Sequence, residues 1–186
     1  MIVAYLLFIL LLVFLLAQRG STVPTPVPDA TLAPVPDVPT HTPDPMDADL
    51  VKATGIFVFG SNRAGQHAGG AARFAADQLG AEWGVGEGRT GFCYALPTKG
   101  HQFTDLTIEE IRAHVDRFID HASEHRNQTF WVTKVGCGIA GWKVSDIAPL
   151  FARAADLRNV KMPIEFERAH TDRAGPQDRQ REVGRN

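Results

Sequence analysis

The chain has 186 residues, a formal net charge of −2 and charged side chains of both signs spread along it. This balance excludes the basic stripe that neutralises nucleic-acid phosphates, so we expect no nucleic-acid partner. The two cysteines, Cys93 and Cys137, lack the spacing of a disulfide scaffold or a zinc site, and we expect reduced thiols and no metal site.

An apolar run, Ile2–Ala17, opens the chain and is followed by Gln18 and Arg19. At about 1.5 Å per residue the run covers roughly 24 Å, which the flanking side chains can extend by snorkelling. No basic residue precedes the run and a good cleavage site is missing, so an uncleaved anchor is favoured over a secretory signal. We predict a transmembrane anchor at 1–20, membrane contact through 2–19 and, from Arg19, a single-pass protein whose domain faces the cytoplasm.

Residues 21–50 hold most of the chain's 12 prolines and show no apolar periodicity. Prolines at this density favour extended polyproline II, so we predict a linker that holds the folded domain away from the membrane. The last stretch, 167–186, is rich in Arg, Asp, Gln and Gly and is predicted to be a disordered tail. The folded domain is therefore expected at 51–166.

Within 51–166, short continuous apolar runs, typical of buried strands, alternate with apolar residues at helical spacing. The most distinct helix begins with a capping box formed by Thr107 and Glu110. The predicted elements are strand Ile56–Phe59, helix Ala68–Leu79, strand Phe92–Leu96, a helix from Thr107 to about His125, strand Thr129–Val135, a helix capped by Ser145 and strand Val160–Phe166. Strands that are apolar throughout are covered on both faces, so we predict an α/β fold, a three-layer α/β/α domain. Its sheet is expected to be mixed.

Glycine-rich turns follow two of the predicted strands, at Gly65–Gly70 and Gly136–Gly141. In open α/β sheets, ligands bind beyond the carboxyl ends of the strands, where free amides at a helix start hold anions such as pyrophosphate. Either turn alone is equally compatible with a tight connection, but two turns at one sheet edge favour a binding site. The P-loop motif and a G-x-G-x-x-G after the first strand are both missing, which argues against kinases, P-loop ATPases and ordinary dehydrogenases.

Four segments together resemble a macrodomain, the fold that binds ADP-ribose. They are FGSN at Phe59–Asn62, GQHAGGAA at Gly65–Ala72, YALPTK at Tyr94–Lys99 and VGCGIAGW at Val135–Trp142. The resemblance covers about Ile56–Phe166 and is greatest to small macro-like proteins of bacteria and phages and to the branch of the terminal ADP-ribose protein glycohydrolase.

The resemblance implies that the ligand is ADP-ribose or a related NAD-derived nucleotide, with no further cofactor. It places Asn62 beside the distal ribose and the adenine in a cleft at the sheet edge. The residues implied at the diphosphate are Gly69, Gly70 and Ala71 on one loop and Gly136, Cys137, Gly138, Ile139, Ala140 and Gly141 on the other.

The resemblance bears on catalysis at two positions of the sequence. In the glycohydrolase branch, a lysine after the strand forms an adduct with the opened ribose, and an aspartate of the glycine loop assists. Lys99 matches the lysine, whereas Ala140 stands at the position of the aspartate. Glu87 is the only carboxylate near glycine-rich backbone that could act as a base. We therefore favour a binding protein over an enzyme, with Lys99 as the candidate catalytic residue of an ADP-ribosyl glycohydrolase.

Several of these side chains also have a plainer interpretation. Asn62 can cap its own turn, Lys99 can be a solvated turn lysine, and His67 can be an exposed loop residue instead of a phosphate contact. Cys137 fits a packing residue better than a nucleophile, and Trp142 either shields the ligand or packs on the core. Three histidines of the long helix are expected at the surface: His114, His121 and His125.

Three functions remain open at this point. The first is a membrane-tethered sensor or effector, whose layout is similar to anti-phage systems of the Thoeris type that join membrane helices to a macro domain. The second is a hydrolase of ADP-ribosyl adducts or ADP-ribose derivatives, and the third is a phage or bacterial accessory protein that binds no nucleotide. A homo-oligomer is compatible with each of them.

Overall fold

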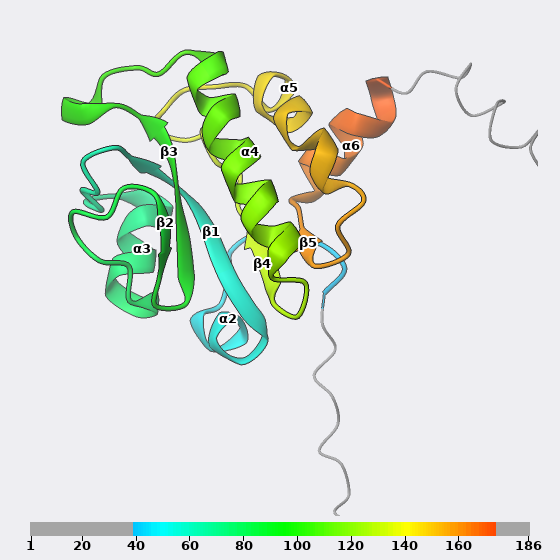
Figure 1. Cartoon of the computed structure of the whole chain (residues 1–186), viewed down its shortest axis with the longest axis horizontal. Coiled ribbons are helices and arrows are strands. Elements are labelled where there is room, and N and C mark those ends of the chain that lie inside the picture. The colour runs from blue at the N-terminus through cyan, green and yellow to red at the C-terminus, as the bar shows by residue number, and fades with distance from the viewer. Residues whose placement is uncertain (1–38, 174–186) are drawn as a thin grey trace, which may run out of the picture. The chain divides into compact units, whose positions relative to one another are not determined.

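The computed structural model describes residues 39–173, which form an α/β domain (Figure 1). The elements in chain order are α2 (Ala48–Thr54), β1 (Gly55–Asn62), α3 (Gly70–Leu79), β2 (Gly88–Thr90), β3 (Cys93–Lys99), η1 (His101–Phe103), α4 (Ile108–Glu124), β4 (Thr129–Val132), α5 (Val144–Ile147), η2 (Ala148–Ala154), β5 (Val160–Lys161) and α6 (Ile164–Arg173). The predicted anchor at 1–20, the linker up to residue 38 and the tail beyond Arg173 lie outside the described residues. Within 39–173, no helix has the length and apolar character needed to cross a membrane.

The sheet has five strands in the order β2-β3-β1-β4-β5. The central strand β1 is parallel to both of its neighbours, with Val58 opposite Tyr94 of β3 and Val132 of β4. Strand β5 is parallel to β4, and β2 alone runs antiparallel, beside β3. The expected mixed sheet is therefore confirmed.

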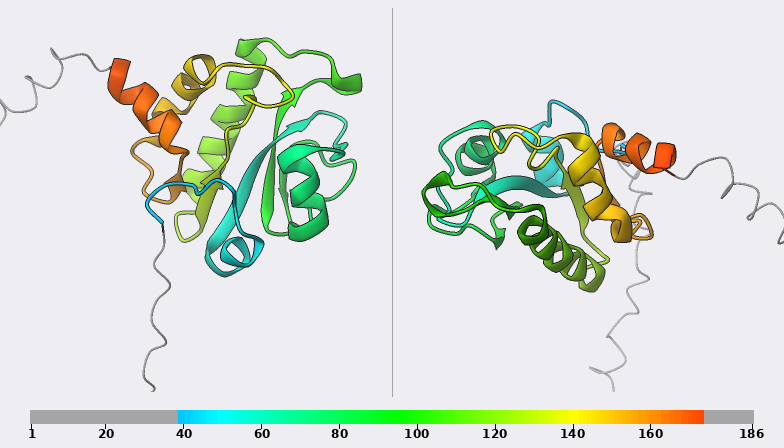
Figure 2. Two further views of the ribbon diagram at one scale, coloured as in Figure 1. Left: turned by 180° about the vertical axis from the view of Figure 1, so that it is seen from behind. Right: turned by 90° about the horizontal axis from the view of Figure 1, so that it is seen from above.

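Helices cover both faces of this sheet, as the continuously apolar strands predicted (Figure 2). Alternate residues of β1 point to opposite faces, so that Ile56 and Val58 pack with the helices α4, η2 and α6. Phe57 and Phe59 pack with α2 and α3 on the other face. Both clusters are closed to water, since Val58 and Phe59 are fully buried.

The capping box predicted for the long helix is confirmed at the N-terminus of α4. The Thr107 hydroxyl accepts a hydrogen bond from the Glu110 amide, and the Glu110 carboxylate accepts one from the Thr107 amide. The buried face of α4 includes Ile111, Val115 and Phe118, which repeat at the expected helical spacing.

The predicted strand Val160–Phe166 is wrong beyond Lys161. Pro163 has no amide proton to donate to the sheet, and its carbonyl instead accepts hydrogen bonds from Phe166 and Glu167 at the start of α6. Helix α6 then continues to Arg173, past the predicted domain boundary at Phe166.

Other boundaries also differ from the prediction. Helix α5 begins before Ser145, and its cap is the Asp146 carboxylate, which accepts a hydrogen bond from the Lys143 amide. At the N-terminal side, helix α2 starts within the predicted linker, and Thr42 is hydrogen-bonded to the carbonyls of Lys161 and Met162. The end of the linker is thus part of the folded domain.

Candidate functional site

The order of the strands creates a crevice at the carboxyl ends of β1 and β4. The chain leaves β1 toward α3 on one face of the sheet and leaves β4 toward α5 on the opposite face. Neighbouring parallel strands whose connections diverge in this way leave a gap between their loops, which is the usual ligand position in open α/β sheets. Both glycine-rich turns lie at this place.

The first turn ends at the N-terminus of α3, where Gly69 is the N-cap residue and no side chain caps the helix. The first helical hydrogen bond at this end runs from the Arg73 amide to the Gly69 carbonyl. Within the described chain, the amides of Gly70, Ala71 and Ala72 have no hydrogen-bond partner. These free N–H groups and the helix dipole together favour an anion.

The second turn is tightly folded and also presents free amides. Its closing hydrogen bonds run from the Gly141 amide to the Gly138 carbonyl, 2.9 Å, and from the Trp142 amide to the Gly136 carbonyl, 3.0 Å. Gly136 has φ +76°, and a side chain there would press on the buried Ile147. The amides of Gly138 and of the two residues after it have no partner among residues 39–173.

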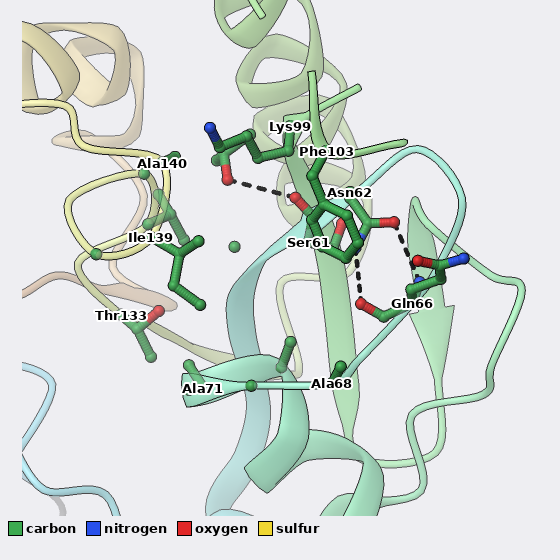
Figure 3. Close-up of a pocket in the computed structure, with 18 of the residues that line it drawn as sticks. Ser61, Asn62, Gln66, Ala68, Ala71, Lys99, Phe103, Thr133, Ile139 and Ala140 are labelled. Atoms are coloured by element: carbon green, nitrogen blue, oxygen red, sulfur yellow. Dashed lines mark hydrogen bonds between the residues drawn. The ribbon is translucent and has the colours of Figure 1, made fainter. Parts of the chain in front are cut away.

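The two turns face each other across a cavity of about 190 Å³ (Figure 3). A Cβ atom added to Gly69 would lie 3.5 Å from the Ile139 side chain, so the loops nearly touch at the cavity mouth. The lining residues come from β1, the first turn and the start of α3, from the end of β3 and η1, and from the segment after β4 with the second turn: Gly60, Ser61, Asn62, Gln66, Ala68, Gly69, Gly70, Ala71, Ala72, Thr98, Lys99, Phe103, Thr133, Lys134, Val135, Gly136, Gly138, Ile139 and Ala140. No Asp, Glu, His or Cys is among them.

The Asn62 side chain caps its own turn, which is the plainer of its two interpretations. Its Oδ1 accepts hydrogen bonds from the Ala64 and Gln66 amides, each 3.1 Å, and its Nδ2 donates to the Gln66 carbonyl at 2.7 Å (Figure 3). Ser61 fixes the same corner, because its hydroxyl donates a hydrogen bond to the Gly86 carbonyl. Asn62 thus shapes the cavity wall.

Lys99 lines the cavity, but its ammonium group is engaged in an ion pair. Nζ lies 2.5 Å from the Asp105 carboxylate, and the two residues also form an isolated β-bridge. The solvated-lysine interpretation is wrong, since only 17% of the side chain is exposed. A nucleophilic role would require this pair to break.

A second cavity, of about 620 Å³, adjoins the first. The two cavities share Gly70, Ala71, Thr133, Lys134 and Gly138, so free amides of both turns lie at the boundary between them. The walls of the second cavity are mainly apolar and include Pro43, Pro45, Met46, Phe57, Phe74, Cys137, Val144 and Pro163. Apolar walls with few polar groups suit the planar base of a nucleotide.

Lys134 is the cation at this boundary. Its Nζ lies 2.7 Å from the Asp44 carboxylate and 3.3 Å from that of Glu165. These two carboxylates raise the pKa of Lys134, so it remains charged at neutral pH. Sequence reasoning missed Lys134, although its place directly after a predicted strand was a usable signal.

Two of the residues predicted at the diphosphate do not line the smaller cavity. Cys137 lines the larger one, and burial raises the pKa of its thiol, which argues against a nucleophile. Gly141 lines neither cavity, because its amide closes the turn. Trp142 packs against the core on the α4 face, as one of its two interpretations held.

The prediction of a surface position is wrong for His114, and the exposed-loop interpretation is wrong for His67. His67 is 1% exposed beneath the first turn, with Nε2 3.1 Å from the Glu82 carbonyl, and burial lowers its pKa. His114 is buried, and its Nδ1 lies 2.8 Å from the Glu87 carboxylate. Glu87 is also paired with Arg117 and lines neither cavity, so it is not placed to act as a base there. The residues that contact these two histidines are distant from them in sequence, so local sequence patterns could not predict their burial.

Comparisons with known protein families, with curated proteins and with solved structures gave no match for this chain.

Proposed function

We propose that this domain binds ADP-ribose or a related NAD-derived nucleotide without turning it over. The observation that carries the proposal is the pair of free amide clusters, at the start of α3 and at 138–140, on opposite sides of one cavity. A diphosphate has acceptor oxygens on two phosphorus atoms, and two facing sets of N–H donors match it. Lys134 lies beside them, and a bound phosphate would compete with the Asp44 and Glu165 carboxylates for its charge.

The two adjoining cavities support a ligand with a group on each side of the diphosphate. The larger, apolar cavity is the place for the adenine, and the smaller one takes the distal ribose near Asn62. A volume of about 190 Å³ alone is below the range of common ligand pockets, so the proposal requires both cavities. The macrodomain resemblance of the sequence points to the same ligand.

Binding without turnover follows from the groups at hand. The lining of the smaller cavity contains no carboxylate, histidine or cysteine, and Lys99 is held by Asp105. General acid–base catalysis needs a titratable group within hydrogen-bond reach of the reacting atoms. Hydrolysis through Lys99 remains the alternative function, and product release from an ADP-ribosylated substrate would support it.

We propose that the domain acts as a nucleotide sensor in bacterial or phage conflict and that residues 1–20 anchor it to a membrane. The last part of the predicted linker is fastened to the site, because Asp44 pairs with Lys134 and Thr42 is bonded to the end of β5. A phosphate that attracts Lys134 competes with Asp44. Ligand binding would in this way loosen the junction between linker and domain.

The test is calorimetric titration of the full chain with ADP-ribose, with Ala71→Glu as the site variant. The new carboxylate would stand at the exposed start of α3, where acidic residues stabilise a helix, so the fold is retained. At about 6 Å from a phosphate it weakens binding by roughly 1–3 kcal/mol, about 5- to 150-fold.

Gln78→Glu is the matched control, since it adds the same charge at an exposed position of the same helix, away from both cavities. We expect Gln78→Glu to bind like the wild type. Equal affinities for the wild type and Ala71→Glu would show that the amides at the start of α3 do not hold the phosphates.

A further inference from the structure

Phe103 is a large apolar side chain left open at the rim of the smaller cavity. It is 46% exposed, and it lies across the cavity from Ile139 (Figure 3). It belongs to residues 100–105, here named the rim loop, between β3 and α4. Nothing in the proposed contacts to base and diphosphate uses this ring.

The rim loop holds Phe103 in a backbone conformation that side chains rarely adopt. Gln102 and Phe103 have φ values of 54° and 59°, in the left-handed region where residues other than glycine are disfavoured. Two consecutive residues of this kind cost free energy, which the surrounding contacts must offset. Such conformations are concentrated at ligand clamps and other functional positions.

The contacts that offset this cost close the rim loop at its base. The Gly100 amide donates to the Thr104 carbonyl at 2.8 Å, and the Thr104 hydroxyl donates to the His101 carbonyl at 3.0 Å. The pair of Lys99 and Asp105 joins the two ends of the loop. Lys99 therefore holds the rim loop in place, a role that does not require it to take part in a reaction.

Phe103 lies at the end of the site that is formed by the smaller cavity alone. Asn62, Lys99 and Phe103 line only the smaller cavity, whereas three of the six residues with free amides, Gly70, Ala71 and Gly138, line both cavities. A ligand with its base in the larger cavity and its diphosphate at the amides would carry its remaining group toward Phe103.

We propose that Phe103 packs its ring against the group beyond the diphosphate and so selects nucleotides that carry a second sugar or ring there. This inference rests on the proposed function. The apolar face of a sugar or of a planar ring is buried against the aromatic ring, whereas a nucleoside diphosphate such as ADP leaves that ring uncovered. The site thereby distinguishes ADP-ribose from the abundant ADP.

The experiment compares ADP-ribose with ADP on the full chain by calorimetry, for the wild type and Phe103→Ala. We expect Phe103→Ala to weaken ADP-ribose binding by about 3- to 10-fold and to leave the affinity for ADP unchanged. Phe103→Tyr keeps an aromatic face and should retain wild-type affinity for ADP-ribose.

Phe92→Ala is the matched control. Phe92 is 44% exposed, close to the value for Phe103, but it precedes β3 at the opposite end of that strand and lines neither cavity. We expect no change in either affinity for this variant.

Each outcome has a distinct meaning. Equal losses for ADP-ribose and ADP in Phe103→Ala, or no loss for either, would overturn the role of Phe103 while leaving nucleotide binding intact. A wild-type protein that binds neither nucleotide would overturn the proposed function itself, and the role of Phe103 with it.

Discussion

Replacement of Asn62 by alanine tests whether this side chain stabilises the turn that follows β1 or only contacts the ligand. The side chain is 4% exposed and makes three hydrogen bonds to the backbone of the turn that follows β1. Each such bond contributes a net stabilisation of about 0.5–1.5 kcal/mol, and the groups left behind have little access to water. We therefore expect Asn62→Ala to lower the free energy of unfolding by about 3 kcal/mol.

Urea unfolding followed by circular dichroism measures this change, with Gln66→Ala as the control. Gln66 takes part in the same cap through its backbone only, and its side chain is exposed, so its removal should change stability by less than about 0.5 kcal/mol. Unchanged stability of Asn62→Ala together with weakened nucleotide binding would refute the cap and favour a direct ligand contact.

Three further predictions follow from buried and paired groups. Burial lowers the pKa of His67, so the unfolded chain binds a proton at this residue more readily than the folded chain. The stability present above about pH 6.5 should therefore be lost as the pH falls toward the lowered pKa. His67→Gln should reduce this loss in urea unfolding curves measured over a pH series, and an unchanged pH dependence would contradict the assignment. Phe118 is fully buried among aromatic rings, and Phe118→Ala should cost about 3–5 kcal/mol by the same assay, so a loss below 1 kcal/mol would contradict this packing. Asp44→Asn removes one of the two carboxylates that pair with Lys134, and because this pair is partly exposed, stability should change by less than about 1 kcal/mol. ADP-ribose should bind a few-fold more tightly, because its phosphate no longer competes with Asp44 for Lys134. Weaker binding would contradict this competition.

Where the sequence carries local signals, the structure follows them closely. The capping box at Thr107 and the apolar spacing behind it predicted α4 because both depend only on residues within a few turns of each other. The continuous apolar runs predicted a sheet covered on both faces for the same reason. The predicted last strand is wrong beyond Lys161, because Pro163 has no amide proton to donate to a sheet and Ile164 and Phe166 belong to α6.

The parts that sequence reasoning missed depend on contacts between distant segments. Strand β2 has no apolar pattern, and it exists because Arg89 and its neighbours pair with β3. The burial of His114 depends on Glu87, which belongs to the loop before β2. Phe103 follows no periodic pattern, and only the fold places it at the rim of the cavity.

The most direct test of the central claim is calorimetric titration of the full chain with ADP-ribose. We predict saturable binding of one nucleotide per chain, weaker binding by Ala71→Glu, and no release of ADP-ribose from a modified protein substrate. Absence of any binding by the wild type at high micromolar ADP-ribose would contradict the proposal that the two facing sets of free amides form a nucleotide diphosphate site.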